Sequence, residues 1–277
     1  MKNPNEGSKV WLFSGVSSGL GRGWAVSLLD KGEFVVGVTR DTASVQDLCN
    51  KYPKKFVAVE ADITDSDILE HKLDVALELS NKKNITHVVC AAAYSHFGTV
   101  EDVSSMELLN NISVNIIGAR NIAVAGLQRM PANGDRRIIF VSSMSGLQCW
   151  PNLGSYQITK FGVRALSETL RLELASQDIQ VGCIYPGPHV DTGWSTEYAK
   201  RTDPSDRYDA EWLIFNSRCG FPLSNVADSL PCFDEMVNSK YMPRAITTHE
   251  EVAEMFKKDA EEIISDLDNS RFNNVVF

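Results

Sequence analysis

Short apolar runs alternate with longer segments of helical period between residues 10 and 185, and this alternation constrains the fold more than any other feature. The runs are rich in Val, Ile and Phe and show little polar alternation, as is typical of strands covered on both faces. We expect strands at Val10–Ser14, Phe34–Thr39, Phe56–Glu60, Thr86–Ala91, Arg137–Ser142, Gln180–Tyr185 and Asn274–Phe277. We expect helices at residues 20–32, 43–52, 66–81, 104–130 and 154–177. The pattern predicts an α/β fold with a doubly wound parallel sheet of about seven strands and helices on both faces.

Size and composition indicate one domain over residues 1–277. The chain has 277 residues, of which 43% are hydrophobic, and no stretch reads as a linker. The net charge of −9 argues against binding to nucleic acid or to an anionic membrane. Six cysteines without a C-x-x-C pair favour reduced thiols and a cytoplasmic location, and the sequence predicts neither a signal peptide nor a membrane span. Five scattered histidines predict no metal site.

A change of composition marks residues 193–246 as an insertion of short helices and loops. Four of its aromatic residues either line an apolar substrate pocket or form a small core of the insertion itself: Trp194, Tyr198, Trp212 and Phe215. An acidic helix is expected after it, with an apolar stripe formed by Val252, Phe256, Ile263 and Leu267.

A glycine-rich turn joins the first expected strand to the first expected helix. It reads Ser14-Gly15-Val16-Ser17-Ser18-Gly19-Leu20-Gly21, a G-x-x-x-G-x-G spacing. Glycines allow the backbone to approach a pyrophosphate closely, and the free N–H groups of a helix start can bind it. In this context the turn predicts a dinucleotide site of the Rossmann type.

Tyr156 and Lys160, in the segment "YQITK", are four residues apart on an expected helix. Positions i and i+4 share one helix face, so the phenol and the ammonium can approach one another. A nearby ammonium favours the phenolate and lowers a tyrosine pKa that is ordinarily about 10. The pair therefore suits proton transfer to and from a carbonyl oxygen near neutral pH.

With these motifs together, the chain resembles the compact branch of the short-chain dehydrogenase/reductase family. Further matches follow the family's order over about residues 9–192: "ADITD" around Asp62, "SVNIIG" with Asn115, "IIFVSSMSG" with Ser143, and the loop "YPGPHVDT". The segments "FGTVEDVS" and "LRLELA" most resemble the corresponding sequences of 17β-hydroxysteroid and retinol dehydrogenases.

The resemblance implies four catalytic residues. Tyr156 would be the acid or base, and Lys160 would lower its pKa and bind the nicotinamide ribose. Ser143 would donate to the substrate oxygen, although the adjacent Ser142 is an alternative assignment. Asn115 would hold a water that links Lys160 to solvent.

The resemblance also implies a cofactor site: Gly15, Ser17, Ser18, Gly19, Leu20, Gly21, Arg40, Asp62, Ile63, Ala91, Ala92, Asn115, Tyr156, Lys160, Pro186, Gly187, Val190 and Thr192. Two departures from the family pattern occur. Cys90-Ala91-Ala92-Ala93 replaces the usual N-N-A-G, and His189 is an extra residue in the P-G loop.

The end of the second strand predicts which nicotinamide cofactor binds. Thr39 stands where an NAD-preferring relative would carry aspartate, and Arg40, which follows, would suit a 2′-phosphate. We therefore expect NADP(H). Two alternatives stay open: a one-residue shift would bring Asp41 into the NAD-selecting position, and Arg40 could be a solvated loop residue.

The sequence as a whole predicts an NADP(H)-dependent oxidoreductase that interconverts a ketone or aldehyde and an alcohol on a bulky hydrophobic substrate. Two other functions use the same features: a dinucleotide sensor without turnover, and a lyase or cyclase that uses the tyrosine without net hydride transfer. The resemblance further implies a homodimer or homotetramer formed through the helices at about 104–130 and 154–177.

Overall fold

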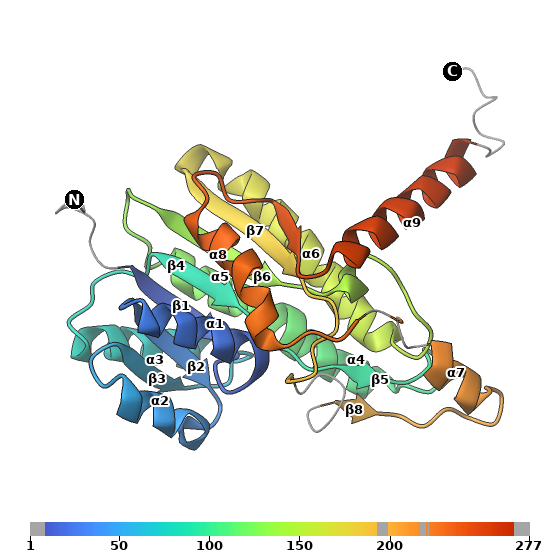
Figure 1. The fold of residues 1–277 in the computed structure, drawn as a ribbon. Helices are drawn as coiled ribbons and strands as arrows, with labels where there is room; N and C mark the ends of the chain where they lie inside the picture. Colours follow the sequence, from blue (N-terminus) through green and yellow to red (C-terminus); the bar gives the residue numbers. More distant parts are fainter. Residues whose placement is uncertain (1–8, 193–198, 217–219, 221, 269–277) are drawn as a thin grey trace.

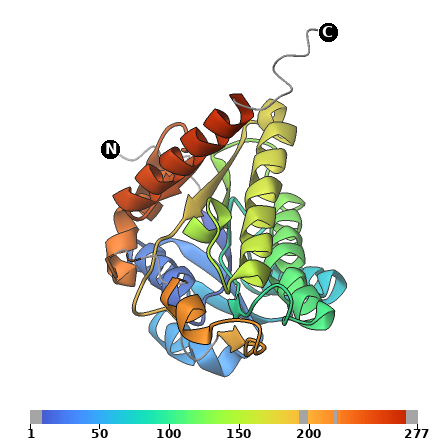
Figure 2. The same cartoon turned by 90° about the vertical axis from the view of Figure 1, so that its right-hand side faces the viewer.

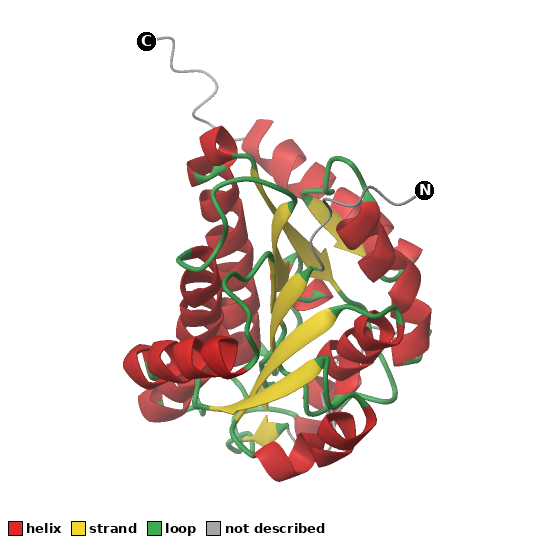
Figure 3. Ribbon diagram, turned by 90° about the vertical axis from the view of Figure 1, so that its left-hand side faces the viewer, coloured by secondary structure: helices red, strands yellow, loops and turns green. Residues whose placement is uncertain are grey.

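A single seven-stranded parallel sheet organises the computed structural model, which describes residues 9–192, 199–216, 220 and 222–268. The strand order is β3-β2-β1-β4-β6-β7-β9, with helices on both faces (Figures 1 and 3). The strands are β1 (Val10–Ser14), β2 (Phe34–Thr39), β3 (Phe56–Glu60), β4 (His87–Cys90), β6 (Arg136–Val141), β7 (Ile179–Tyr185) and β9 (Ala245–Thr247). The predicted doubly wound Rossmann-type fold is confirmed.

The helices follow the strands in alternation. They are α1 (Gly19–Asp30), α2 (Gln46–Lys51), α3 (Ser66–Leu79), α4 (Ser105–Ile112), α5 (Ala119–Leu127), α6 (Gly154–Glu173), α7 (Ala210–Asn216), α8 (Leu230–Asn238) and α9 (Glu250–Asp268). Short 3₁₀ helices are η1 (Thr42–Val45), η3 (Met144–Gly146), η4 (Ala175–Gln177) and η5 (Val226–Ser229). Figure 1 shows α9 projecting outward from the body, and in Figure 2 its far end (red) reaches about as high in the view as the end of α6 (yellow).

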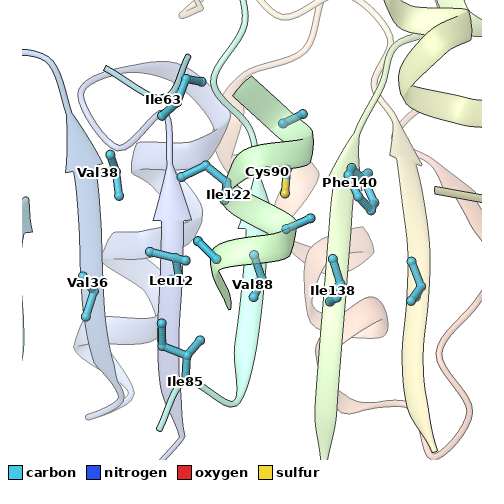
Figure 4. Close-up of a cluster of buried hydrophobic side chains, with 14 of the residues drawn as sticks. Leu12, Val36, Val38, Ile63, Ile85, Val88, Cys90, Ile122, Ile138 and Phe140 are labelled. Carbon is cyan, nitrogen blue, oxygen red and sulfur yellow. The ribbon is translucent and has the colours of Figure 1, made fainter. Parts of the chain in front are cut away.

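The core has two layers because successive strand residues point to opposite faces of the sheet. On one face Leu12, Val36 and Val88 pack in one cluster with residues of α3, α5 and α6 (Figure 4). On the other face Trp11 and Phe13 pack with residues of α1, α2 and α8. Burial on both faces explains why the strands read as continuous apolar runs.

The structure differs from the expected elements at two places. The seventh strand is β9, a three-residue strand that pairs with β7, whereas the strand expected at Asn274–Phe277 lies outside the described residues. The helix expected over 104–130 is divided into α4 and α5 by η2, a π-helical turn at Ser113–Gly118. A π-turn inserts an extra residue per turn, which a 3.6-residue period does not reveal.

A second, two-stranded sheet lies beside the main one. β5 (His96–Phe97) pairs in parallel with β8 (Lys200–Arg201), so Phe97 lies opposite Arg201. The main sheet reverses its strand order between β1 and β4. Ligands of open α/β sheets bind outside the carboxyl ends of the strands at such a reversal.

Within the described ranges, no helix is both long enough and apolar enough to cross a bilayer.

Candidate active site

A cavity of about 1460 Å³ opens at the carboxyl ends of the main-sheet strands. The loops after β1, β2, β3, β4, β6 and β7 all contribute to its lining. Among the predicted site residues, those that line it are Gly15, Ser17, Ser18, Gly19, Leu20, Gly21, Arg40, Asp62, Ile63, Ala91, Ala92, Ser143, Tyr156, Lys160, Pro186, Gly187 and Thr192. Asn115 and Val190 do not line it.

The glycine turn packs tightly against the end of β4. Gly15 has φ +77°, and a Cβ there would lie 2.8 Å from the Ala92 nitrogen. A Cβ on Gly21 would overlap the Gly15 carbonyl oxygen. The Ser14 hydroxyl accepts hydrogen bonds of 3.2 Å from the N–H groups of Ala91 and Ala92. Ala91 and Ala92, which belong to the segment that replaces N-N-A-G, are thus held through their backbone N–H groups by the Ser14 hydroxyl, without side-chain amides.

The first turn of α1 supplies hydrogen-bond donors to the cavity. Ser18, the residue before the helix, makes no side-chain capping hydrogen bond. The first N–H groups of a helix have no partner within it. Those of Gly19, Leu20 and Gly21 lie in the cavity lining, so a pyrophosphate fits this position by charge and by hydrogen bonding.

The loop after β2 contributes the Arg40 side chain to the cavity lining. Arg40 is exposed and makes no hydrogen bond or ion pair with any residue that the structure describes. Asp41, by contrast, caps η1 by accepting a 2.9 Å hydrogen bond from the Ala43 N–H. The Thr39 hydroxyl donates to the Asp41 carbonyl. The Arg40 guanidinium is therefore available to a ligand, while one oxygen of the Asp41 carboxylate is used in capping η1.

Helix α6 presents Tyr156 and Lys160 to the same cavity, and both side chains are buried. The Lys160 ammonium lies 5.5 Å from the centroid of the Tyr156 ring and donates a 3.0 Å hydrogen bond to the Val141 carbonyl. Burial lowers the pKa of Lys160 to about 8. The ammonium thus remains largely protonated at neutral pH in a water-poor environment.

The two adjacent serines differ in their hydrogen bonds. Ser142 donates to the Lys160 backbone carbonyl at 2.8 Å, so its proton is engaged in structure. The Ser143 oxygen accepts from the Ser145 N–H at 3.1 Å, which leaves its hydroxyl proton available for a ligand. This difference favours Ser143 as the donor to a substrate oxygen.

The Asn115 side chain lies in the π-turn and joins three segments. Its oxygen accepts from the Tyr94 N–H at 3.0 Å, and its amide donates to the Tyr94 carbonyl and to the Thr159 hydroxyl at 2.9 Å each. Thr159 lies between the tyrosine and the lysine on α6 and donates to the Tyr156 carbonyl. Asn115 therefore positions the segment after β4 against α6; the expected water link stays a prediction.

The P-G loop after β7 packs on the glycine turn. A Cβ on Gly19 would lie 3.4 Å from the Thr192 methyl group. His189, the extra residue, is 8% exposed and lines the cavity, and its Nδ1 lies 2.9 Å from the Gly187 carbonyl. That contact requires Nδ1 to carry the proton. Val190 points away, with 54% of its surface exposed.

The outer part of the cavity consists of residues that sequence reasoning did not find. The segments after β4, before α6 and around β8 contribute Tyr94, Phe97, Trp150, Leu153, Lys200 and Arg201. Trp212 does not line the cavity and is 55% exposed. Trp194, Tyr198 and the Phe215 side chain lie outside the described residues. His96 is buried and contacts the Thr202 hydroxyl rather than the cavity.

Within the part of the chain that the structure describes, no group of three or more His, Cys, Asp or Glu side chains is arranged to hold a metal ion.

Comparison with known proteins connects this geometry to a family. The family model described as short chain dehydrogenase matches residues 9–203. An oxidoreductase, BOA17, of Botryotinia fuckeliana is 28% identical over 73% of this chain and 73% of its own length. The NADPH-dependent 3-dehydrocapnine reductase of Ornithobacterium rhinotracheale is 28% identical over 64% of each chain, slightly less than two thirds of that relative.

A solved structure extends the likeness to nearly the whole chain. The crystal structure of a short-chain dehydrogenase from Streptomyces avermitilis superposes with a TM-score of 0.86, at 23% identity, over 95% of this chain and 96% of that one. At this identity the likeness concerns the fold. The superposed part of the chain extends beyond residue 203, where the match to the family model ends.

Proposed function

This chain belongs to the short-chain dehydrogenase family and is an oxidoreductase, and from that premise we propose that it interconverts a ketone or aldehyde and an alcohol with NADP(H). The observation that carries the proposal is the common cavity of Tyr156, Lys160 and Ser143. All three are buried, and the same cavity is lined by Gly19, Leu20 and Gly21 at the start of α1, where the first N–H groups of a helix can bind a pyrophosphate.

The protein's own residues handle the proton and the developing charge. In reduction, the Tyr156 hydroxyl gives its proton to the substrate oxygen, and in oxidation the phenolate takes it back. The Lys160 ammonium stabilises that phenolate by its charge in a buried site. The free hydroxyl proton of Ser143 stabilises the negative oxygen. The nicotinamide group, when bound, supplies or accepts the hydride.

NADP(H) is the proposed cofactor because Arg40, which directly follows β2, lines the cavity and has no partner among the described residues. Its guanidinium would bind a 2′-phosphate through charge-assisted hydrogen bonds. The name of the NADPH-dependent bacterial relative supports the same choice. NAD(H) would need a carboxylate toward the ribose, and one oxygen of the Asp41 carboxylate already accepts the η1 capping hydrogen bond.

Measurement of NADPH oxidation with bulky ketones tests the proposal, with Tyr156→Phe as the decisive variant. Loss of the hydroxyl removes general acid catalysis, so kcat should fall by about 100-fold or more. Binding of NADPH, followed by its fluorescence, should persist in the variant. Turnover that survives the substitution would refute the tyrosine's role.

The same experiment separates the other candidate functions. A sensor would bind NADPH without consuming it. A lyase or cyclase would give a product whose mass contains no two added hydrogens. Neither alternative is favoured by a specific feature of the cavity.

We propose that residues 193–246 cover the substrate. Five described members of this segment line the cavity: Lys200, Arg201, Ile214, Gly220 and Leu223. Together with Tyr94, Phe97 and Trp150 they would surround a bulky substrate with a largely apolar wall.

We further propose that the protein forms a homodimer or homotetramer through α4, α5 and α6. Large apolar side chains are exposed along α4 and α6 and in the intervening η2, at Met106, Leu109, Ile117, Ile158, Phe161 and Leu172. Burial of such a surface would stabilise association. A cytoplasmic location stays a prediction; the described cysteines are free thiols.

A further inference from the structure

The reaction end of the cavity is cationic, although the chain as a whole carries a net charge of −9. The described lining includes Lys160, Lys200 and Arg201 at this end, and Arg40 at the adenosine end. Its carboxylates, within the described residues, are those of Asp41 and Asp62, in the loops after β2 and β3 at the adenosine end.

Lys200 and Arg201 are adjacent on β8 and lie over aromatic rings of the cavity wall. The Lys200 ammonium is 5.1 Å from the centroid of the Tyr94 ring, and the Arg201 guanidinium carbon is 4.5 Å from that of Phe97. These cation–π contacts hold the charges against the wall. An oxyanion would bind through their N–H groups rather than through the stacked faces.

The cations also lie close to the proposed chemistry. Phe97, which pairs with Arg201 across the small sheet, belongs to one buried cluster with Leu153 and Tyr156. Ala199, immediately before Lys200, packs against that same cluster. A substrate whose carbonyl reaches Tyr156 therefore extends along Phe97 toward the two cations.

Lys200 forms no ion pair with any residue in the described ranges. The Glu107 carboxylate accepts hydrogen bonds from the neutral hydroxyls of Ser104 and Thr202 and keeps its charge, whereas Glu101 pairs with Arg207. A cation without a carboxylate partner at a concave, partly apolar wall favours an anionic ligand by charge complementarity.

We propose that the substrate is an amphipathic ketone or alcohol with an oxyanion group, such as a carboxylate, sulfonate or phosphate, bound by Lys200 and Arg201. This inference rests on the proposed oxidoreductase function and specifies its substrate class. The apolar part of the substrate would contact Phe97, Trp150 and Leu153, and the oxyanion would lie at β8.

A pair of ketones that differ only in charge tests the inference: 9-oxodecanoate and 9-oxodecanamide, each with NADPH. The wild-type enzyme should show a kcat/KM about tenfold higher for the acid at low salt, as a partly exposed pair of charge-assisted contacts provides. The preference should shrink at about 0.15 M salt, where the Debye length is about 8 Å.

Variants locate the source of the preference. In Lys200→Gln/Arg201→Gln, kcat/KM for the acid should fall about tenfold, and that for the amide by a much smaller factor. Arg207→Gln is the matched control, because Arg207 is an exposed arginine near β8 that pairs with Glu101 and does not line the cavity. It should keep the acid preference. Equal kcat/KM for acid and amide in the wild type, or equal losses in the double variant, would overturn the inference.

A binding measurement separates failure of this inference from failure of the proposed function. If neither ketone is reduced, the redox proposal fails, and calorimetric titration of the NADPH-loaded protein with decanoate and decanamide decides the charge question. Tighter binding of decanoate that is lost in the double variant supports the inference. Equal binding of both compounds, or no binding of either, overturns it. Sulfonate and phosphate analogues then identify the preferred oxyanion.

Discussion

Replacement of Arg40 should change which nicotinamide cofactor the enzyme uses. The side chain is exposed, lines the adenosine end of the cavity and has no partner in the described structure. A charge-assisted contact to a 2′-phosphate at such a site is worth about 1–2 kcal/mol after allowance for solvent screening. Arg40→Gln should therefore lower kcat/KM for NADPH by roughly 5- to 30-fold. The value for NADH should stay within about twofold of the wild type, because NADH lacks that phosphate.

The assay compares kcat/KM for NADPH and NADH with one ketone at fixed ionic strength. Arg22→Gln is a suitable control, since Arg22 is a nearby arginine that pairs with Asp47 and does not line the cavity. It should change neither value much. The reasoning would be refuted if Arg40→Gln weakened both cofactors equally, or if the wild-type enzyme preferred NADH.

Three further predictions concern buried polar groups. Lys160→Met should abolish turnover but raise the unfolding free energy of the cofactor-free protein at pH 7 by about 1–3 kcal/mol. The reason is that burial lowers the pKa of this lysine to about 8 from 10.5, so the folded protein holds its charge at a cost. A loss of stability in urea unfolding would contradict this prediction. Burial lowers the pKa of His87 to about 4 from 6.5, despite Asp135 at 3.5 Å, so the unfolded chain binds the proton more readily. Stability should fall as pH drops from 6.5 to 4, by up to about 3 kcal/mol, and His87→Gln should flatten that part of the curve in urea titrations. Asn115→Ala removes three buried hydrogen bonds and should lower the unfolding free energy by about 2–4 kcal/mol; a change below about 0.5 kcal/mol would show that the π-turn does not depend on them.

The sheet could be predicted because its strands are covered on both faces. Val10–Ser14, Phe34–Thr39 and Phe56–Glu60 match the expected ranges, since continuous apolar runs bounded by glycine or charged residues are strong local patterns. β9 was missed because it has three residues, none of them fully buried, and its pairing with β7 bridges 60 residues of sequence. The predicted helix over 104–130 missed the π-turn, because an inserted residue does not disturb the composition.

In the site, too, the residues that could be predicted belong to short sequence motifs, and the residues that were missed depend on pairing between distant segments. The glycine turn and the spacing of Tyr156 and Lys160 are local, and these residues line the cavity except Ser14 and Val16 of the turn. Lys200 and Arg201 enter it only through a two-residue ladder with β5, about 100 residues earlier in the chain. No pattern within their own segment indicates that pairing. Likewise, the difference between Ser142 and Ser143 depends on hydrogen bonds to α6 and η3 that the sequence does not specify.

The electrostatics of α6 explain why the site accepts a cost in stability. Lys160 is 3% exposed, and no carboxylate within the described residues lies at ion-pair distance from it; its hydrogen bond goes to the neutral Val141 carbonyl. A buried carboxylate partner would stabilise the folded protein, because it would favour the charged form of the lysine. It would also cancel the positive charge that a Tyr156 phenolate requires. A neutral acceptor fixes the ammonium in place and leaves its field directed at the tyrosine, so the lowered lysine pKa and the proposed proton transfer follow from the same arrangement.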